Sequence, residues 1–582
     1  MSDDRTIPTP APSDLPSFTV TSGGQAVPGT VRVESVAVHR RFNKVAEAVV
    51  VVLDGDVAAE DWPVSNEPTF APGAEIEVHA GYHSEEELIF RGVAVRHGVQ
   101  AGGAGAARLT VTCKDAAVRL TVGRKSAVWA DVTDADVIDE IASAAGLDAD
   151  VALDGPTHPE LVQLDALDWD FVVARAEAAG ALVATDDGTL RVGPPDPAAA
   201  PALALRYGGN VIDLALAADA RDQLAAVEAV GWDPAEQAVL AMEGADPGVT
   251  APGDLAAADL AAVAGPDVAR VRHGGALADA ELQAWADAQL LKSRLAQVQG
   301  HVRIKGFAEV RPGSTVDLAG VGGRFTGTAF VSGVSHEIRS GSWETVLEIG
   351  LDPAWFVASH DDVSAPPAGA LVPAARGLSV GVVTALEGDP GEAFRIAVRL
   401  PLVSEAGELW ARLATLDAGD GRGSVFRPEV GDEVVVGFLG GDPRQPVVLG
   451  ALHGPAKAPP IDPSDDNHEK GFVTRGGHKI TVDDDAGVVT VATEGGQTVT
   501  LSDDAEAVTL ADAHGNVLVL DADGIRLESA ADLLLKASGD VTVEGTNVSA
   551  SASAAFAAEG GSGSTLESSA TTTVKGSLVQ IN

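Results

Sequence analysis

Along most of this chain, hydrophobic and polar positions alternate over short segments bounded by turn residues. Alternation with a period of two is typical of β-strands that bury one face. Between residues 18 and 122 the segments are separated by turn formers such as Pro72-Gly73. We therefore expect a first β-barrel over 18–122. Its predicted strands are 31–38, 48–53, 75–79, 88–95 and 107–112.

A helical period replaces the alternation in three places. Thr133 precedes one apolar run as an N-cap candidate and Gly146 ends it, and a second run, 168–180, also ends in glycine. These runs predict a helical and hairpin insertion over 123–199. A third run, 279–299, is bracketed by strand patterns, and it predicts a second β-barrel with a helix over 200–359.

A smaller β domain is predicted over 377–455, after a proline-containing linker at 360–376. Five strands of this length suit an OB-fold barrel. A Pro- and Asp-rich connector, 456–477, follows. The predicted barrel strands are 378–385, 393–400, 408–413, 432–439 and 447–452.

From residue 478 to 582 strand patterns recur every 8 to 10 residues. A single-chain β-helix needs roughly 20 residues for each coil, so this step is one strand and one turn. A lone sheet of such strands leaves a face and both edges unprotected. We expect three chains to close an intertwined triple-stranded β-helix needle, while an ordinary β-meander remains the alternative. The strands are expected at 479–482, 488–491, 497–501, 507–510, 517–520, 525–527, 533–535 and 540–544, with alternation again at 572–575 and 578–581 after a narrow Ala-, Ser-, Gly- and Thr-rich stretch.

Composition and charge limit the partners. The chain has 39 Lys and Arg against 85 Asp and Glu, a net charge of −46. Such a surface repels nucleic acid, because phosphate binding needs basic side chains. The predicted OB barrel has six arginines against eleven acidic residues, so we expect no oligonucleotide binding there. Residues 1–17 hold four prolines and predict a flexible arm. They lack a basic segment followed by an apolar run, so we expect no secretory signal in them.

No pattern of catalytic or metal-binding residues stands out. The connector 456–477 is too short for a lysozyme-like domain with two placed carboxylates. There is no nucleophile elbow and no Walker loop. We therefore expect no catalytic residue, no cofactor and no metal. An alternative is a β-helix polysaccharide-degrading enzyme, and a further one is a tail-fibre-like adhesin; four Lys and Arg in 478–582 speak against the first.

One hairpin carries a resemblance to a known family. The segments Phe426–Val434, Gly441–Pro443 and Pro446–Gly450 resemble the OB-domain signature of VgrG-type spike proteins of contractile injection systems. The run 474–480 is similar to the start of their β-helix, and 168–180 to their phage-hub-like part. The neck motif taken from this resemblance is Phe426, Pro428, Glu429, Val430, Gly431, Asp432, Glu433, Gly441, Asp442 and Pro443.

The resemblance implies a non-enzymatic homotrimer that is the spike of an injection particle. The hub would sit on the inner tube among baseplate proteins, and sheath contraction would drive the spike through a target membrane. A PAAR-type tip protein would dock on the end of the needle, at Leu578, Val579, Gln580, Ile581 and Asn582. The resemblance favours an extracellular, phage-tail-like particle over a type VI spike. The protein is then made in the cytoplasm and belongs to a particle that stays there or is released.

Overall fold

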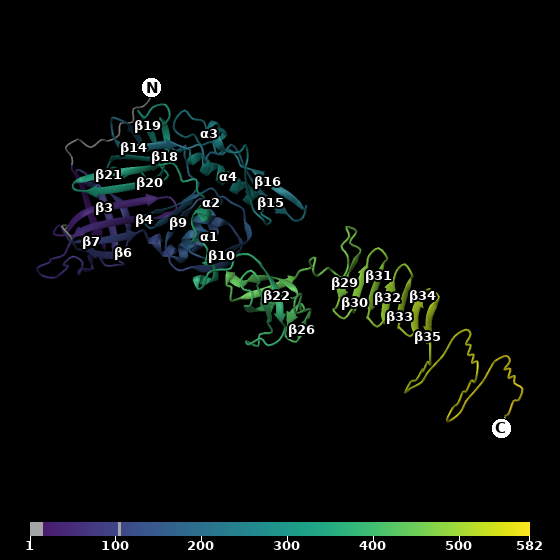
Figure 1. Ribbon diagram of the computed structural model, residues 1–582. Coiled ribbons are helices and arrows are strands. Elements are labelled where there is room, and N and C mark those ends of the chain that lie inside the picture. The colour runs from purple at the N-terminus through teal and green to yellow at the C-terminus, as the bar shows by residue number, and fades with distance from the viewer. Residues whose placement is uncertain (1–14, 103–105, 582) are drawn as a thin grey trace. The chain divides into compact units, whose positions relative to one another are not determined.

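The computed structural model describes residues 15–102 and 106–581, which divide into two compact units. Unit 1 comprises residues 1–376 and 438–445, and unit 2 comprises 377–437 and 446–582. Strands predominate in both units (Figure 1), so the mainly β fold class is confirmed. Most of the arm predicted at 1–17 lies outside the described residues, although Pro16 and Ser17 already belong to the first strand.

One sheet of thirteen strands runs through the larger part of unit 1. The sequence predicts two hub-type barrels here; in the structure the strands of both belong to one sheet, because β3 (Arg32–Arg41) pairs with β20 (Gly327–Arg339) and joins the two halves. Pairing removes two sheet edges that would otherwise expose unpaired backbone groups. Each half keeps its own apolar core. The other strands are β1 (Pro16–Ser22), β2 (Gln25–Ala26), β4 (Lys44–Leu53), β5 (Glu75–Tyr82), β6 (Glu85–Gln100), β7 (Arg108–Lys114), β13 (Leu203–Arg206), β14 (Val211–Ala218), β18 (Val298–Lys305), β19 (Thr315–Ala319) and β21 (Ser342–Ile349).

The predicted insertion contains two helices and two small sheets. Helix α1 (Asp134–Ala144) begins at a capping box, in which the Thr133 hydroxyl accepts from the backbone N–H of Asp136. Helix α2 (Asp168–Ala178) ends just before Gly180, whose φ of +72° suits glycine. Both helices pack into one apolar core. The strands are β8 (Lys125–Val132) with β10 (His158–Ala166), and β9 (Asp148–Val151) with β11 (Leu182–Asp186) and β12 (Thr189–Gly193).

A second insertion interrupts the other half of the sheet. Helix α4 (Asp279–Leu295) packs Leu282, Ala286 and Leu290 against β15 (Val227–Asp233). The helix was expected to reach Gln299, but it ends earlier because Val298 begins β18, which pairs on both sides. The remaining elements are β16 (Ala238–Glu243), α3 (Ala257–Ala264), β17 (Ala269–Arg272) and α5 (Phe356–Ser359).

In unit 2 the five predicted OB strands close into a barrel. Their order around it is β22, β23, β24, β28 and β27, which confirms the OB-type barrel. Alternate residues such as Val434 and Val436 are fully buried inside it. The bounds are β22 (Ser379–Ala385), β23 (Ile396–Arg399), β24 (Glu408–Leu413), β27 (Glu433–Phe438) and β28 (Pro446–Ala451), with a small hairpin of β25 (Ala418–Gly419) and β26 (Arg422–Gly423).

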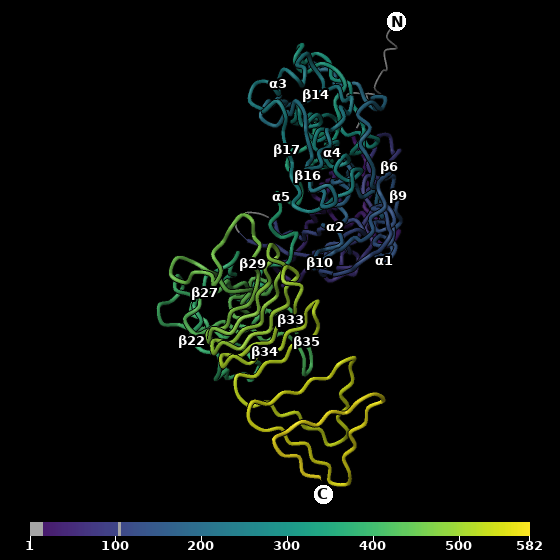
Figure 2. The backbone as a smooth tube through the Cα atoms, turned by 90° about the vertical axis from the view of Figure 1, so that its right-hand side faces the viewer, coloured from purple at the N-terminus to yellow at the C-terminus, as the bar shows by residue number. Residues whose placement is uncertain are grey.

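After the barrel, seven strands form an antiparallel meander (Figure 2). Its first strand, β29 (Glu469–Val473), lies inside the segment predicted as a connector. Up to Glu528 the ladder follows the prediction. The strands expected at 533–535, 540–544, 572–575 and 578–581 are wrong for the single chain, because no neighbouring strand of the same chain pairs with their backbone. The other meander strands are β30 (Lys479–Asp483), β31 (Val488–Ala492), β32 (Thr498–Ser502), β33 (Ala507–Ala511), β34 (Val517–Asp521) and β35 (Gly524–Glu528).

Candidate functional site

One face of the meander is aliphatic, whereas the other mixes threonine with alanine, valine and charged residues. Neighbours in register on one face are all aliphatic: Ile480 pairs with Val491, Val491 with Val499, and Val499 with Leu510. The side chains of this aliphatic face remain partly or largely exposed in the single chain, Ile480 at 49% and Leu501 at 46%. The complete aliphatic face is Ile480, Val482, Val489, Val491, Val499, Leu501, Val508, Leu510, Leu518, Leu520, Ile525 and Leu527.

The opposite face of the same sheet is centred on a row of threonines. Thr481, Thr490, Thr500 and Thr509 follow one another across four neighbouring strands. Threonine has a β-branched side chain that suits a strand and a hydroxyl that tolerates water. The meander therefore has one face that water can cover and one that needs an apolar cover.

The neck motif fastens the OB barrel to the first strand of the meander. The ring of Phe426 stacks on the ring of Phe472 in β29, with centroids 5.2 Å apart and planes 18° apart. Next to this stack, Glu429 forms an ion pair of 2.8 Å with Arg475 in the β29–β30 turn. The hydrogen bond that the Lys457 ammonium donates lowers the pKa of the Asp432 carboxyl below its usual range. Sequence analysis named Phe426, Glu429 and Asp432 as part of the neck motif but did not identify their partners within the chain.

Other residues of the motif shape the hairpin itself. Gly431 has a φ of +90°, which a side chain rarely adopts, and its N–H donates to the backbone of Val383. Val430 is 59% exposed and Glu433 begins β27. Pro428 lies in the irregular stretch before β27 and takes part in none of these contacts.

The remaining motif residues lie at the opposite end of β27. The carbonyl of Gly441 accepts from the N–H of Ala375 at 2.8 Å, so this turn packs against the linker. Asp442 forms an ion pair with Arg444 within the turn, and Pro443 follows it. The structure thus places the motif in two groups, one on the meander and one on the linker.

The predicted tip residues take part in none of these contacts. Leu578, Val579, Gln580 and Ile581 are exposed and outside any strand of the described chain. Asn582 lies outside the described residues. Docking of a tip protein on this segment stays a prediction.

Helix α2 fastens several parts of unit 1 through charged side chains that are buried. Arg175 donates to both carboxylate oxygens of Asp134, at 2.6 and 3.0 Å, and so ties α2 to α1. Glu177, 4% exposed, pairs with the Lys292 ammonium of α4 and accepts from the Phe356 N–H at 2.6 Å. Sequence reasoning recognised this helix by its motif but assigned no role to its charges. The sequence signal that could have revealed this role is the presence of charged residues on the apolar side of the helix.

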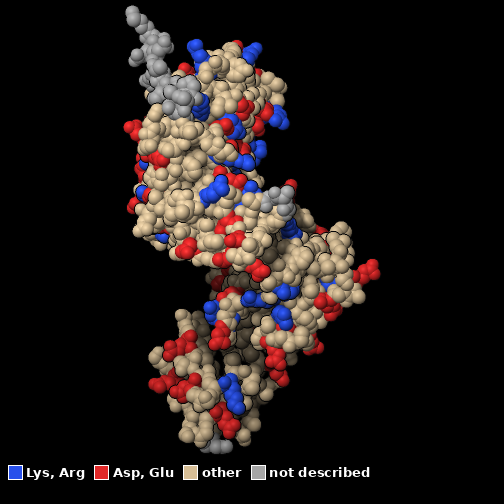
Figure 3. All heavy atoms as spheres, turned by 90° about the vertical axis from the view of Figure 1, so that its left-hand side faces the viewer, with Lys and Arg blue, Asp and Glu red and all other residues tan. Residues whose placement is uncertain are grey.

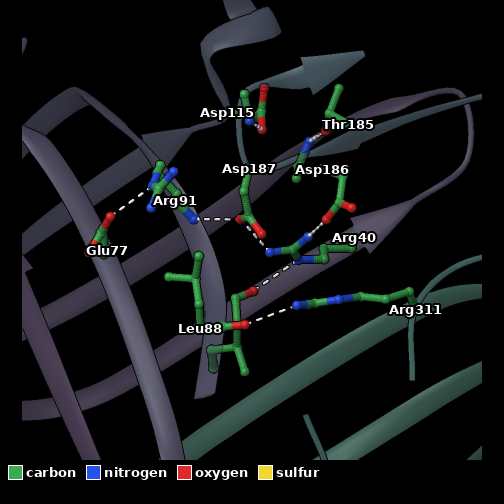
Figure 4. Close-up of polar contacts among 12 residues, drawn as sticks. Arg40, Glu77, Leu88, Arg91, Asp115, Thr185, Asp186, Asp187 and Arg311 are labelled. Carbon is green, nitrogen blue, oxygen red and sulfur yellow. Dashed lines mark hydrogen bonds and ion pairs between the residues drawn. The ribbon is translucent and has the colours of Figure 1, made fainter. Parts of the chain in front are cut away.

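A second buried ionic group joins the insertion to the first half of the sheet. Arg40, 2% exposed, contacts Asp186 at 2.8 Å and Asp187 at 2.5 Å in the β11–β12 turn (Figure 4). Its Nε donates to the Ile89 carbonyl at 2.9 Å. From the other half of the sheet, Arg311 donates to the neighbouring Leu88 carbonyl at 2.9 Å. These contacts hold three sequence-distant parts of unit 1 together.

The described surface carries charged side chains of both signs (Figure 3). Acidic and basic side chains are interspersed on the face shown in Figure 3. Within 15–102 and 106–581, no group of three or more His, Cys, Asp or Glu is placed to hold a metal ion. Over the same residues, every helix is too short or too polar to cross a bilayer.

Comparison with protein-family profiles identifies the family of this chain. The family profile described as the Alg8 N-terminal domain matches residues 12–340, more than half of the chain. The chain belongs to this family. A second profile, described as the Type VI secretion system/phage-baseplate injector OB domain, matches residues 379–453, the closed barrel of unit 2.

Two curated relatives are type VI secretion system spike proteins. VgrG4b of Pseudomonas aeruginosa is 45% identical over 53 residues, which is 9% of this chain and 7% of that protein. VgrG3 of Vibrio cholerae is 34% identical over 91 residues, 14% of this chain and 9% of that protein. The matched stretches thus span less than a tenth of each relative. Together with the OB profile they confirm the resemblance to VgrG-type spike proteins.

The solved structures that match include a tail protein and a type VI secretion component. For the tail protein from Neisseria meningitidis MC58, 98% of that chain aligns with 59% of this one, at 16% identity and a TM-score of 0.44. The E. coli c3393 protein, described as a type VI secretion component similar to T4 tail proteins, covers 74% of this chain with 99% of its own length, at 14% identity and a TM-score of 0.38.

Proposed function

We propose that three copies of this chain form the spike and hub of a contractile injection system. The observation that carries the proposal is the aliphatic face of β30–β35, which has no cover within the described chain. Burying a Val, Leu or Ile side chain completely contributes about 1.5–3 kcal/mol. Covering the half-exposed members of this face in an assembly therefore contributes on the order of 10 kcal/mol per chain. A copy of the same sheet is the matching cover, because it presents the same aliphatic residues.

The width of the sheet favours three copies. Strands β30–β35 each have five residues, which span about 17 Å. Three walls of that width enclose a triangular prism whose walls lie about 5 Å from the axis, half of the ~10 Å spacing of stacked sheets. Aliphatic side chains then fill the interior. Four such walls would lie about 8 Å from the axis, so their side chains would leave the centre of the prism empty. Two walls would leave the lateral edges of both sheets open.

The chain after Glu528 supports the same assembly. Residues 529–581 form no strand in the described chain, yet their apolar side chains, such as Leu534 and Phe556, are exposed. Backbone groups in an ordered segment need partners, and neighbouring chains would supply them. This part is then the intertwined β-helix of the needle, and each meander before it is one wall.

The wider roles rest on the relatives. The spike sits on the inner tube and baseplate through unit 1, carries a PAAR-type tip protein at 578–582, and pierces a target membrane when the sheath contracts. It acts without catalysis, after synthesis in the cytoplasm, in a particle of the extracellular or the type VI kind. A polysaccharide-degrading β-helix is disfavoured, since such coils stack parallel strands whereas β29–β35 are antiparallel.

Native mass spectrometry of the full chain tests the assembly, with adjacent residues of β32 as matched variants. Leu501→Asp places a charge on the aliphatic face and should reduce the trimer to monomers. Thr500→Asp places the same charge on the opposite face and should leave the trimer intact. A monomeric or dimeric wild-type protein, or equal effects of the two variants, would contradict the proposal.

A further inference from the structure

A cavity of about 250 Å³ lies in unit 1 between α4 and the insertion that carries α1 and α2. The contacts proposed above for assembly of the trimer do not involve this cavity. Its apolar walls include Leu277 and Trp285 on the side of α4 and Trp355 ahead of α5. Both indole rings are only partly buried. The cavity therefore offers two aromatic surfaces to a molecule that enters it.

The floor of the cavity is a closed polar group. Asp134 and His158 are 5% and 6% exposed, and Arg175 binds Asp134 through two nitrogens. The Nε2 atom of His158 lies 3.2 Å from Asp134 and also 3.2 Å from Arg175. The positive charge of Arg175 is thus taken up by Asp134. An anionic ligand would find no unpaired cation on this floor.

Glu281 on α4 is different, because its carboxylate has spare capacity. Its nearest donors are Arg175 Nη2 at 3.5 Å and His158 Nδ1 at 4.0 Å, both longer than an ordinary N–H···O bond. Its side chain is 25% exposed, so solvent or a ligand can reach it. At the rim, exposed Asp154 adds a second carboxylate. Apart from the imidazole of His273, which is exposed and also lines the cavity, the accessible polar side chains are carboxylates, which accept hydrogen bonds and carry negative charge.

We propose that this cavity binds a protonated amine or guanidinium group carried on an apolar stem. Glu281 accepts hydrogen bonds from the cation, and Trp285 covers the stem and attracts the charge through its ring face. Trp355, whose ring already lies 5.6 Å from the Lys292 ammonium, only covers the stem. The volume lies below the range of drug-sized pockets, so it suits one side chain or one small molecule. The ligand is either a free organic amine or a Lys or Arg side chain of a partner protein.

Calorimetric titration of the full-length protein with two matched pairs of ligands tests the proposal. Butylguanidinium is compared with neutral butylurea, and a blocked Ala-Arg-Ala peptide with its citrulline counterpart. In at least one pair the cation should bind tenfold or more tightly than its neutral isostere. Preference for butylguanidinium indicates a free amine, and preference for the peptide indicates a protein side chain. Equal binding within both pairs, or no binding at tens of millimolar, overturns the proposal.

Variants locate the binding. Glu281→Gln should abolish the preference for the cation, whereas Glu140→Gln, an exposed acid of α1 outside the cavity, should leave it unchanged. Asp154→Asn removes an exposed rim charge without disturbing the buried group, and it should weaken cation binding severalfold. Trp285→Phe should reduce the change in tryptophan emission that accompanies binding, and Trp355 accounts for what remains. An unaltered preference in both Glu281→Gln and Asp154→Asn places the ligand elsewhere.

Discussion

Phe426, on the way into the OB barrel's β27, stacks on Phe472 in the first strand of the meander, at 5.2 Å between ring centroids. The two rings connect a closed barrel to an open sheet within unit 2, and the adjacent Glu429–Arg475 ion pair spans the same junction. The neck is therefore held by contacts within one chain. Assembly of three chains can add to these contacts but need not create them.

Removing this stack should loosen the start of the meander. Aromatic pairs contribute about 0.5–1.5 kcal/mol beyond the area they bury. We expect Phe426→Ala to speed amide hydrogen exchange in β29 about tenfold while leaving the barrel strand β23 unchanged. Phe394→Ala, which truncates a phenylalanine that is 84% exposed, is the control and should leave β29 unchanged. Equal protection of β29 in all three proteins would show that the rings do not fasten it.

The buried ionic group around Arg40 should dominate the stability of unit 1. Arg40→Met removes the guanidinium that pairs with Asp187 and leaves Asp186 only its ion pair with the more exposed Arg191. Loss of one partner from a buried pair costs about 3–5 kcal/mol. A lower midpoint in chemical denaturation followed by circular dichroism measures this. The nearby Arg91, whose side chain is 54% exposed, pairs with Glu77 (Figure 4), and Arg91→Ala should cost about 1 kcal/mol or less. Similar costs for the two variants would contradict the role of burial.

Buried His336 should make unit 1 sensitive to acid. Its imidazole is completely buried, and this burial, with the charges of Arg40 and Arg311 nearby, lowers the pKa to about 3. The unfolded chain protonates near pH 6.5 and the folded chain does not, so stability falls as pH drops from 6.5 toward 3, by up to about 1.4 kcal/mol per pH unit.

Replacing this residue should weaken the pH dependence. We expect the difference in Tm between pH 7 and pH 4.5 to be smaller in His336→Gln than in the wild type. His514→Gln, in an exposed turn of the meander, is the control and should keep the wild-type difference. If His336→Gln shows the same difference, other groups govern the acid response.

A turn glycine in the meander should resist substitution. Gly496 has a φ of +86°, and a Cβ there would lie 3.3 Å from the Cβ of Ala513. A β-branched residue costs at least about 1–2 kcal/mol in this conformation, so Gly496→Val should lower the Tm of the meander. Gly450→Val, in strand β28 with open space around the position, should change it little. A Tm of Gly496→Val equal to that of the wild type would indicate that the turn adapts.

The strands that the sequence predicted correctly are those whose alternation of apolar and polar residues is visible locally. Alternation identified β30 to β35 and the five barrel strands, because each strand shows its buried side in its own residues. Strand β29 was missed because charged residues and Gly471 hide its alternation. The pairing of β3 with β20 was missed because it joins residues almost three hundred positions apart, and no local signal marks such a partner.

Partners that are far apart in the sequence also limited the prediction of the site. The α2 motif was visible, but the partner of Arg175 lies 41 residues away and that of Glu177 lies 115 residues away. The aliphatic face was predicted as an alternating pattern, and register turned it into a continuous surface. Charge pairing across the cavity beside α4 depends on three elements at once and could not be read from any one of them.

The register of the meander also means that the length of the sheet changes in whole repeats of two strands. Thr481 and Thr500, like Thr490 and Thr509, occupy equivalent places two strands apart, at an interval of about nineteen residues that extends the sheet by about 10 Å. Deleting or duplicating one such interval preserves both faces and the width of every strand. The reach of the sheet can thus evolve in uniform increments while its cross-section stays constant.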